Sequence, residues 1–227
     1  MVIFRYAVKR NFRSPIPIIV SLILLIGLLS LSGLWGDDDS RGYYYVALVI
    51  LLLSFPITGI ITNDRRDRTV IRILTGPTTT FRYLSQNLLA CMVPILLQIV
   101  ITGILGMMWH DWGLEFTFYL SLSYAVFAAT SVAFSFAWNC IFKSKEVSFT
   151  VLTMVMTFSA LAGILLPLEF LPGILRVIFI VFPTFWVASG IEELIENGAS
   201  LWLAMCLLML IGFVVVFLLD GSKRGAY

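Results

Sequence analysis

Side chains that could carry out catalysis are few in this sequence, and they do not gather. The single histidine, His110, stands beside Asp111 in a gap between two apolar stretches. The pair resembles half of an acid–base relay, but no nucleophile lies near it in the sequence. We therefore predict no hydrolytic chemistry and expect His110 to be an interfacial, solvated side chain.

Metal and nucleotide chemistry are not indicated either. Cys91, Cys140 and Cys206 lack the spacing of a metal site, so we expect small buried hydrophobic residues at these positions. The sequence contains no Gly-x-x-x-x-Gly-Lys-Ser/Thr motif, which is the loop that cradles nucleotide phosphates. We therefore expect no cofactor or metal on this chain and no hydrolysis of ATP by it.

Ion-coupled transport would need ionisable side chains at membrane depth. The centres of the apolar stretches hold none, and Gln98 and Asn139 are the strongest polar residues there. We expect each of these two amides to form interhelical hydrogen bonds rather than a transport site. Transport by this chain would then need energy from another source.

The elements that must position these residues are membrane helices. The chain is 60% hydrophobic and 12% charged, and a helix needs about 20 apolar residues to cross a bilayer. Six stretches meet that length, at residues 16–35, 43–62, 88–109, 116–142, 147–167 and 201–219. The fold class predicted is an all-α integral membrane protein, forming one domain over residues 1–227 with six transmembrane helices within 16–219.

Charge sets the orientation. Of the fifteen Lys and Arg residues, all except Arg41 and Arg176 lie before the first stretch or in every second gap after it. Most acidic residues lie in the other gaps, namely Asp37, Asp38, Asp39, Asp111, Glu115, Glu169, Glu192, Glu193 and Glu196. Because basic residues near span ends stay in the cytoplasm, we expect both termini to be cytoplasmic.

Two further segments lie at the membrane without crossing it. Residues 168–198 are apolar, but Pro172, Arg176 and Pro183 interrupt them, so we expect a re-entrant helical hairpin in the outer leaflet between spans 5 and 6. Residues 1–14 predict an amphipathic interfacial helix. Its apolar face would hold Ile3, Phe4, Ala7, Val8 and Phe12, opposite Arg5, Lys9 and Arg13. A basic lead of this kind also precedes cleaved signal peptides, but we expect a retained first helix, because the apolar run is long enough to span.

The loop at residues 63–77 mixes charges of both signs with apolar residues and ends at Gly76-Pro77. A loop that only fixed orientation would need basic residues alone. The apolar residues therefore predict a short amphipathic helix that packs against a partner.

The chain resembles the membrane subunit of an ATP-binding-cassette exporter of the type-2 permease family, which handles drugs, antibiotics, peptides and polysaccharides. The resemblance rests on a charged run with a hydrophobic-basic stretch and a proline after the second span, where Thr69, Arg72, Leu74 and Pro77 match and Arg68 replaces the usual glycine. A second run between the last two spans matches at Gly163, Pro167, Leu171, Pro172, Arg176, Pro183 and Trp186.

The resemblance implies partners and site residues. Two such permeases, copies or siblings, would pair in the lipid bilayer above two cytoplasmic ATPases, which would carry ATP and Mg²⁺; no nucleic acid is involved. The coupling residues would be Asp64, Arg65, Asp67, Arg68, Thr69, Ile71, Arg72 and Leu74. The outer hairpin, at Pro167, Leu171, Pro172, Arg176 and Pro183, would cap the pathway.

The family's pathway runs between the two subunits and is lined by the second and fifth spans. Here these spans carry hydroxyl stripes and neighbouring residues at Ser54, Thr58, Thr62, Thr150, Thr153, Met154, Thr157 and Phe158. Such a lining suits hydrophobic or amphipathic cargo, such as a drug, an antimicrobial peptide or a lipid. Hydroxyl stripes also mediate helix packing, and that interpretation stays open.

We expect a multi-pass exporter subunit in the plasma membrane of a prokaryote. A membrane sensor or assembly protein without transport is the main alternative, and an ion-coupled secondary carrier is a weaker one.

Overall fold

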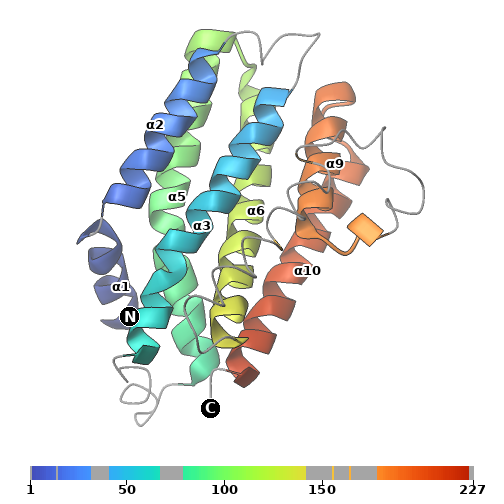
Figure 1. Cartoon of the computed structure of the whole chain (residues 1–227). Coiled ribbons are helices and arrows are strands. Elements are labelled where there is room, and N and C mark those ends of the chain that lie inside the picture. Colours follow the sequence, from blue (N-terminus) through green and yellow to red (C-terminus); the bar gives the residue numbers. More distant parts are fainter. Residues whose placement is uncertain are drawn as a thin grey trace.

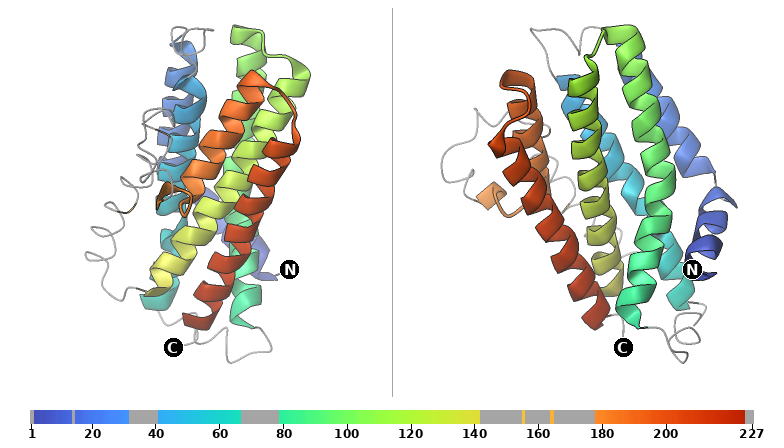
Figure 2. Two further views of the ribbon diagram at one scale, coloured as in Figure 1. Left: turned by 90° about the vertical axis from the view of Figure 1, so that its right-hand side faces the viewer. Right: turned by 180° about the vertical axis from the view of Figure 1, so that it is seen from behind.

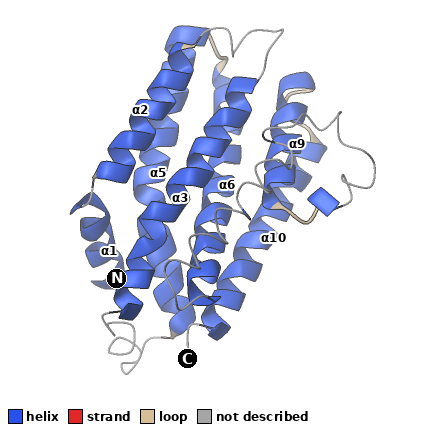
Figure 3. Ribbon diagram, viewed as in Figure 1, coloured by secondary structure: helices blue, strands red, loops and turns tan. Residues whose placement is uncertain are grey.

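The computed structural model describes residues 2–13, 15–31, 41–66, 79–141, 155, 164 and 178–224 (Figure 1). Within these ranges the secondary structure is helical, and Figure 3 shows no strand there. The helices are α1 (Val2–Arg13), α2 (Ile16–Ser30), α3 (Arg41–Arg66), α5 (Thr80–His110), α6 (Leu114–Ile141), α9 (Pro183–Glu196) and α10 (Leu201–Arg224). The described part of the chain therefore has the all-α fold that the sequence predicted.

Four of these helices are long and apolar enough to cross a bilayer: α3, α5, α6 and α10. The pair α1 and α2 would supply a fifth crossing if it counts as one broken span, with a bend of 69° between its halves. Helix α2 has only 15 residues, or roughly 22 Å at 1.5 Å per residue, which is shorter than a hydrocarbon core of about 30 Å. The predicted span at 147–167 falls almost wholly outside the described residues, so a count of six stays a prediction.

The two ends of the bundle differ in charge. The N- and C-terminal ends of the chain lie at the same end of the bundle in Figures 1 and 2, as an even number of crossings requires. We call this the basic end, because it carries Arg5, Lys9, Arg82 and Lys223; the opposite, acidic end carries Asp111, Glu115, Glu192, Glu193 and Glu196. Arg41 and Asp220 depart from this separation. That the basic end faces the cytoplasm stays a prediction from the charge rule.

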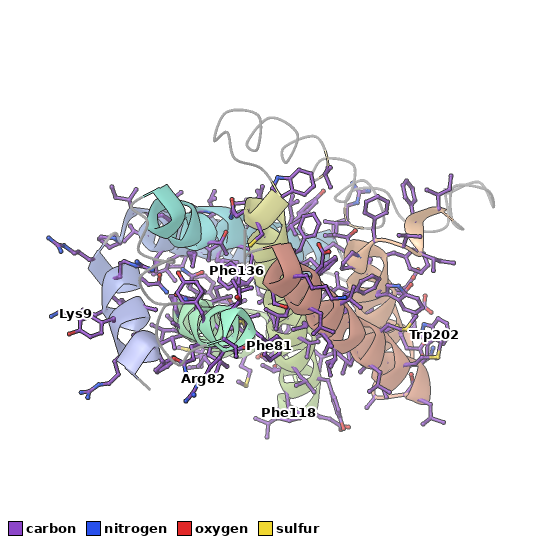
Figure 4. All side chains as sticks on the ribbon, turned by 90° about the horizontal axis from the view of Figure 1, so that it is seen from below. Lys9, Phe81, Arg82, Phe118, Phe136 and Trp202 are labelled. Carbon is purple, nitrogen blue, oxygen red and sulfur yellow. The ribbon has the colours of Figure 1, made fainter. Side chains whose placement is uncertain are left out.

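Helix α6 lies at the centre of the bundle. It packs against α3, α5, α9 and α10, and its Tyr124, Phe127 and Phe136 are at most 1% exposed. Figure 4 shows the outer edge of the same helix, where Phe118 points away from the bundle. The apolar surface that remains exposed, as on Leu208 of α10, is what a helix presents to lipid.

Helix α1 docks on α5 through a side that is not purely apolar. Ala7 and Asn11 are its most buried described residues, whereas Phe12 is 47% exposed. The Asn11 side-chain amide donates a 3.0 Å hydrogen bond to the carbonyl of Ala90 on α5. Lys9 lies on the side of α1 away from the bundle (Figure 4). The predicted amphipathic helix is present, but the side that contacts α5 includes the Asn11 amide, which the predicted apolar face did not contain.

Helix α9 corresponds to the second half of the predicted outer hairpin. It begins at Pro183, near mid-height of the bundle, and rises to the acidic end, where α10 starts downward (Figure 1). Gly190 faces α10 here, and a Cβ at this position would make an ordinary van der Waals contact of 3.4 Å with the Cβ of Cys206. The first half of the hairpin, before residue 178, lies outside the described residues.

Candidate functional site

Polar side chains on α5 bind the N-terminal helices. The Gln98 amide donates to the Ile18 carbonyl at 2.9 Å and to the Ser21 hydroxyl at 2.8 Å, both on α2. Gln98 is 3% exposed, so these bonds are shielded from water. The prediction that Gln98 makes an interhelical contact is confirmed. Asn139 also has an interaction, and the predicted interhelical hydrogen bond of its amide stays a prediction.

His110 is half buried rather than solvated. Its Nε2 lies 2.8 Å from the Leu29 carbonyl near the end of α2, and its ring is stacked at 6.1 Å from Trp112. Trp112 and Tyr43 are each 8% exposed and lie 5.4 Å apart, with Phe116 completing the cluster. These rings therefore pack between helices α3, α5 and α6 at the acidic end.

The predicted coupling segment begins inside α3. This helix continues to Arg66, so Asp64 and Arg65 have helical backbone, and their side chains lie outside the described set. The remaining predicted coupling residues, Asp67, Arg68, Thr69, Ile71, Arg72 and Leu74, lie outside the described residues. The chain returns at α5, where the Thr79 hydroxyl accepts a hydrogen bond from the Arg82 backbone N–H. The end of α3 and the start of α5 both lie at the basic end.

The hydroxyls predicted on the second span point into the bundle. Ser54 and Thr58 are 0% exposed, and their hydroxyls donate to the carbonyls of Ile50 and Phe55 on their own helix, each at 2.9 Å. Thr62 is in α3, with its side chain outside the described set. Thr150, Thr153, Met154, Thr157 and Phe158 lie outside the described residues. The path lining therefore stays a prediction.

A cavity of about 210 Å³ lies within the single subunit. Among the described residues its lining comes from α3, α6, α10, Val155 and the start of α9: Leu51, Phe127, Thr130, Ser131, Phe134, Val155, Val181, Phe182, Pro183, Thr184 and Phe217. Leu51 lies one helical turn before Ser54, and Val155 follows Met154. The cavity thus brings together the two segments that the sequence singled out, with Pro183 of the predicted hairpin at its edge.

The contribution of α6 to this cavity was not predicted. Thr130 donates to the Val126 carbonyl at 3.0 Å and to the Leu210 carbonyl of α10 at 3.1 Å, and Ser131 donates to the Phe127 carbonyl at 2.9 Å. The sequence shows the repeated Ser and Thr residues of α6. A row of hydroxyl residues that lines a cavity has the same sequence pattern as a row that packs against another helix.

Charged side chains stay at the ends of the four described spans. Arg41, Arg82 and Glu115 lie in the first turn of their helices, and Asp220 and Lys223 lie in the last turns of α10. In the part of the chain that the structure describes, no group of three His, Cys, Asp or Glu side chains could hold a metal ion. The cavity described above is lined by apolar side chains and hydroxyl groups. Pockets of this composition bind ligands mainly through their shape and through apolar contact.

Comparison with known proteins identifies a family. The sequence model of the family described as "ABC-2 family transporter protein" matches residues 36–219, which is most of the chain and covers α3, α5, α6, α9 and α10 as far as Leu219. No curated protein matches the chain significantly.

Proposed function

The chain belongs to the ABC-2 transporter family, and from this membership we infer that it is the permease subunit of an ATP-driven exporter. Membrane components of this family carry the transport path and are not themselves the catalysts. We propose that two such permeases, identical or sibling, pair in the plasma membrane of a prokaryote. Two separate ATPase subunits would bind ATP and Mg²⁺ beneath them.

The observation that carries the proposal is the position of charge along the described spans. Along α3, α5, α6 and α10, the Asp, Glu, Lys, Arg and His side chains lie only in the end turns. An ion-coupled carrier would need such groups at membrane depth. The energy for transport is therefore better supplied from outside the membrane, as an ATPase does.

We propose that the ATPases contact the basic end through the segment from Asp64 to Leu74. Support comes from the continuity of α3, which extends as one helix from the acidic end to Arg66. A helix transmits displacement as a rigid body, so movement at Arg66 would reach the level of Thr58, which lies on the same side of Pro56 within the helix. This geometry suits a device that converts closure of the ATPases into a change of access.

The cargo proposed is hydrophobic or amphipathic: a drug, an antimicrobial peptide or a lipid-like molecule. Its path would run between two subunits, along the second and fifth spans. Uncharged side chains dominate the described stretch of the second span, and its hydroxyl protons are bound within the helix. A path of this composition would not compensate the loss of water around an ion.

Copurification tests the proposal. The chain, extracted gently with its neighbouring gene products, should bring down a soluble protein with a phosphate-binding loop. A bifunctional thiol cross-linker should join the Leu74→Cys variant of the chain to that ATPase. Trp202→Cys, at the acidic end, is the matched control and should form no cross-link to the ATPase. Reconstituted vesicles should then move an amphipathic dye only with ATP and Mg²⁺. Transport driven by an ion gradient alone, or a stable chain with no ATPase, would contradict the proposal.

A further inference from the structure

The cavity inside the subunit has the form of a binding site that opens at one edge. Val181 lines it and is 70% exposed, whereas Phe127 and Thr130 on the opposite side are 0% exposed and Thr184 is 1% exposed. The site therefore has an accessible rim before α9 and a closed floor on α6. The rim lies near mid-height of the bundle, at the level where α9 begins (Figure 1).

The walls are aromatic. Phe134 of α6 and Phe217 of α10 form one side, with ring centroids 5.2 Å apart in an edge-to-face arrangement. Phe182 forms part of the rim, with its ring 6.3 Å from that of Phe179. Aromatic rings in such positions attract another ring through edge-to-face or offset contacts.

The floor offers no strong polar partner. The hydroxyl protons of Thr130 and Ser131 are donated to backbone carbonyls, and none of the described lining residues is charged. Buried water needs two to four polar partners, so this floor favours an apolar occupant over water. A charged group would lose its hydration here without compensation.

Size limits the occupant. An engineered cavity of about 150 Å³ lined by aliphatic and aromatic side chains binds benzene, and sites for drug-sized ligands start at about 300 Å³. A volume of about 210 Å³ lies between these two. It accommodates one substituted aromatic ring or a short alkyl group.

We propose that this cavity binds an uncharged apolar molecule, or the apolar ring of a larger one, that enters from the bilayer past Val181. The described lining of this cavity comes from one subunit, whereas the proposed transport path would lie between two subunits. It would let a single permease chain bind a membrane-dissolved aromatic compound without ATP and without its partner subunit.

Photolabelling tests this inference on the full chain in lipid nanodiscs. The probe is a phenyl trifluoromethyl diazirine, an uncharged aromatic molecule, and mass spectrometry locates the label. Label on residues 127–134 should saturate with probe concentration and be displaced by toluene. Label on lipid-facing Phe118 of the same helix should rise linearly (Figure 4).

Matched variants test whether the probe binds in this cavity. Val181→Trp should raise the half-saturating probe concentration about tenfold, because the added ring would take the place of the probe's ring, and loss of one buried ring's apolar contact has at least that effect. Val216→Trp, at a 59% exposed valine on α10 outside the lining, should leave it unchanged. Ser131→Leu, which fills the floor, should have the same effect as Val181→Trp.

Linear, non-displaceable label on residues 127–134 would overturn the proposal, and so would equal effects of the two tryptophan variants. The experiment uses neither ATP nor an ATPase, so its outcome is independent of the proposed exporter function. A chain that labels saturably but transports nothing would retain the binding site and refute the function.

Discussion

Replacing Gln98 with leucine separates a structural role from a transport role. The Gln98 amide donates two hydrogen bonds to α2, and leucine is of similar size, so the change removes the bonds without opening a large cavity. Interhelical hydrogen bonds inside membranes contribute about 0.6 kcal/mol each on average. The expected loss is therefore about 1.2 kcal/mol of unfolding free energy, from two bonds of about 0.6 each.

The expected loss of unfolding free energy stays at about 1.2 kcal/mol, because the substitution leaves no buried carbonyl without a hydrogen bond. The Ile18 carbonyl keeps a 2.9 Å hydrogen bond from the Ser21 hydroxyl after Gln98 is gone. Burial of an unsatisfied group, which would raise the loss to about 1–3 kcal/mol, is thus avoided. A fall in export per folded molecule is not expected, because the amide faces α2 rather than the proposed path.

The assay is reversible unfolding by SDS in mixed micelles, followed by far-ultraviolet circular dichroism. Gln98→Leu, Ser21→Ala and the double variant form a cycle, in which a coupling of about 0.6 kcal/mol is expected. Leu97→Ala, on the 52% exposed neighbouring residue, is the control and should change little, because lipid replaces its contacts. Zero coupling, or a Gln98→Leu protein that is fully stable but exports nothing, would refute the reasoning.

Three further outcomes are expected. Gly106→Ala should destabilise the protein by about 1–3 kcal/mol, because a Cβ at this position would overlap the buried ring of Trp112. Near-ultraviolet circular dichroism should show the loss of aromatic packing. An unchanged spectrum with full stability would contradict this prediction. His110→Ala should lower stability by about 0.6 kcal/mol and leave export per folded molecule nearly intact, so a large loss of export with normal folding would count against a structural role. Thr58→Trp, at a fully buried position of α3, should reduce export into vesicles by a larger factor than it reduces expression. Leu52→Trp, at a 54% exposed position of the same helix, should leave export unchanged. Equal export by the two variants would argue against the proposed path.

The positions of the long helices could be predicted closely from the sequence. The expected span at 116–142 became α6 at Leu114–Ile141, and the span at 201–219 became part of α10. The first span was predicted less well, since α2 ends at Ser30 rather than near residue 35. Hydropathy locates an apolar run, but it does not say where the helix within that run stops.

The candidate site was predicted in part. Of the predicted path residues, Ser54 and Thr58 are described and lie beside the segment that supplies Leu51 to the cavity. The α6 side of the cavity escaped prediction, because serine and threonine on a central helix have the same pattern whether they pack or line a space. The contact between Tyr43 and Trp112 could not be predicted for a similar reason: aromatic residues near span ends are typical of a membrane interface, and the sequence does not show which of them meet across helices.

What the sequence by itself determined is the membrane class, the alternation of charge and the family. Lipid and water act on each segment through its own hydropathy and charge, and both properties are fixed before any helix meets another. Only the tertiary structure decided that α1 binds α5 through Asn11, that His110 contacts the end of α2, and that five separated segments enclose one cavity. These features depend on which faces of the helices meet, and that follows from packing between residues far apart in the chain, such as His110 and Leu29, which are 81 positions apart.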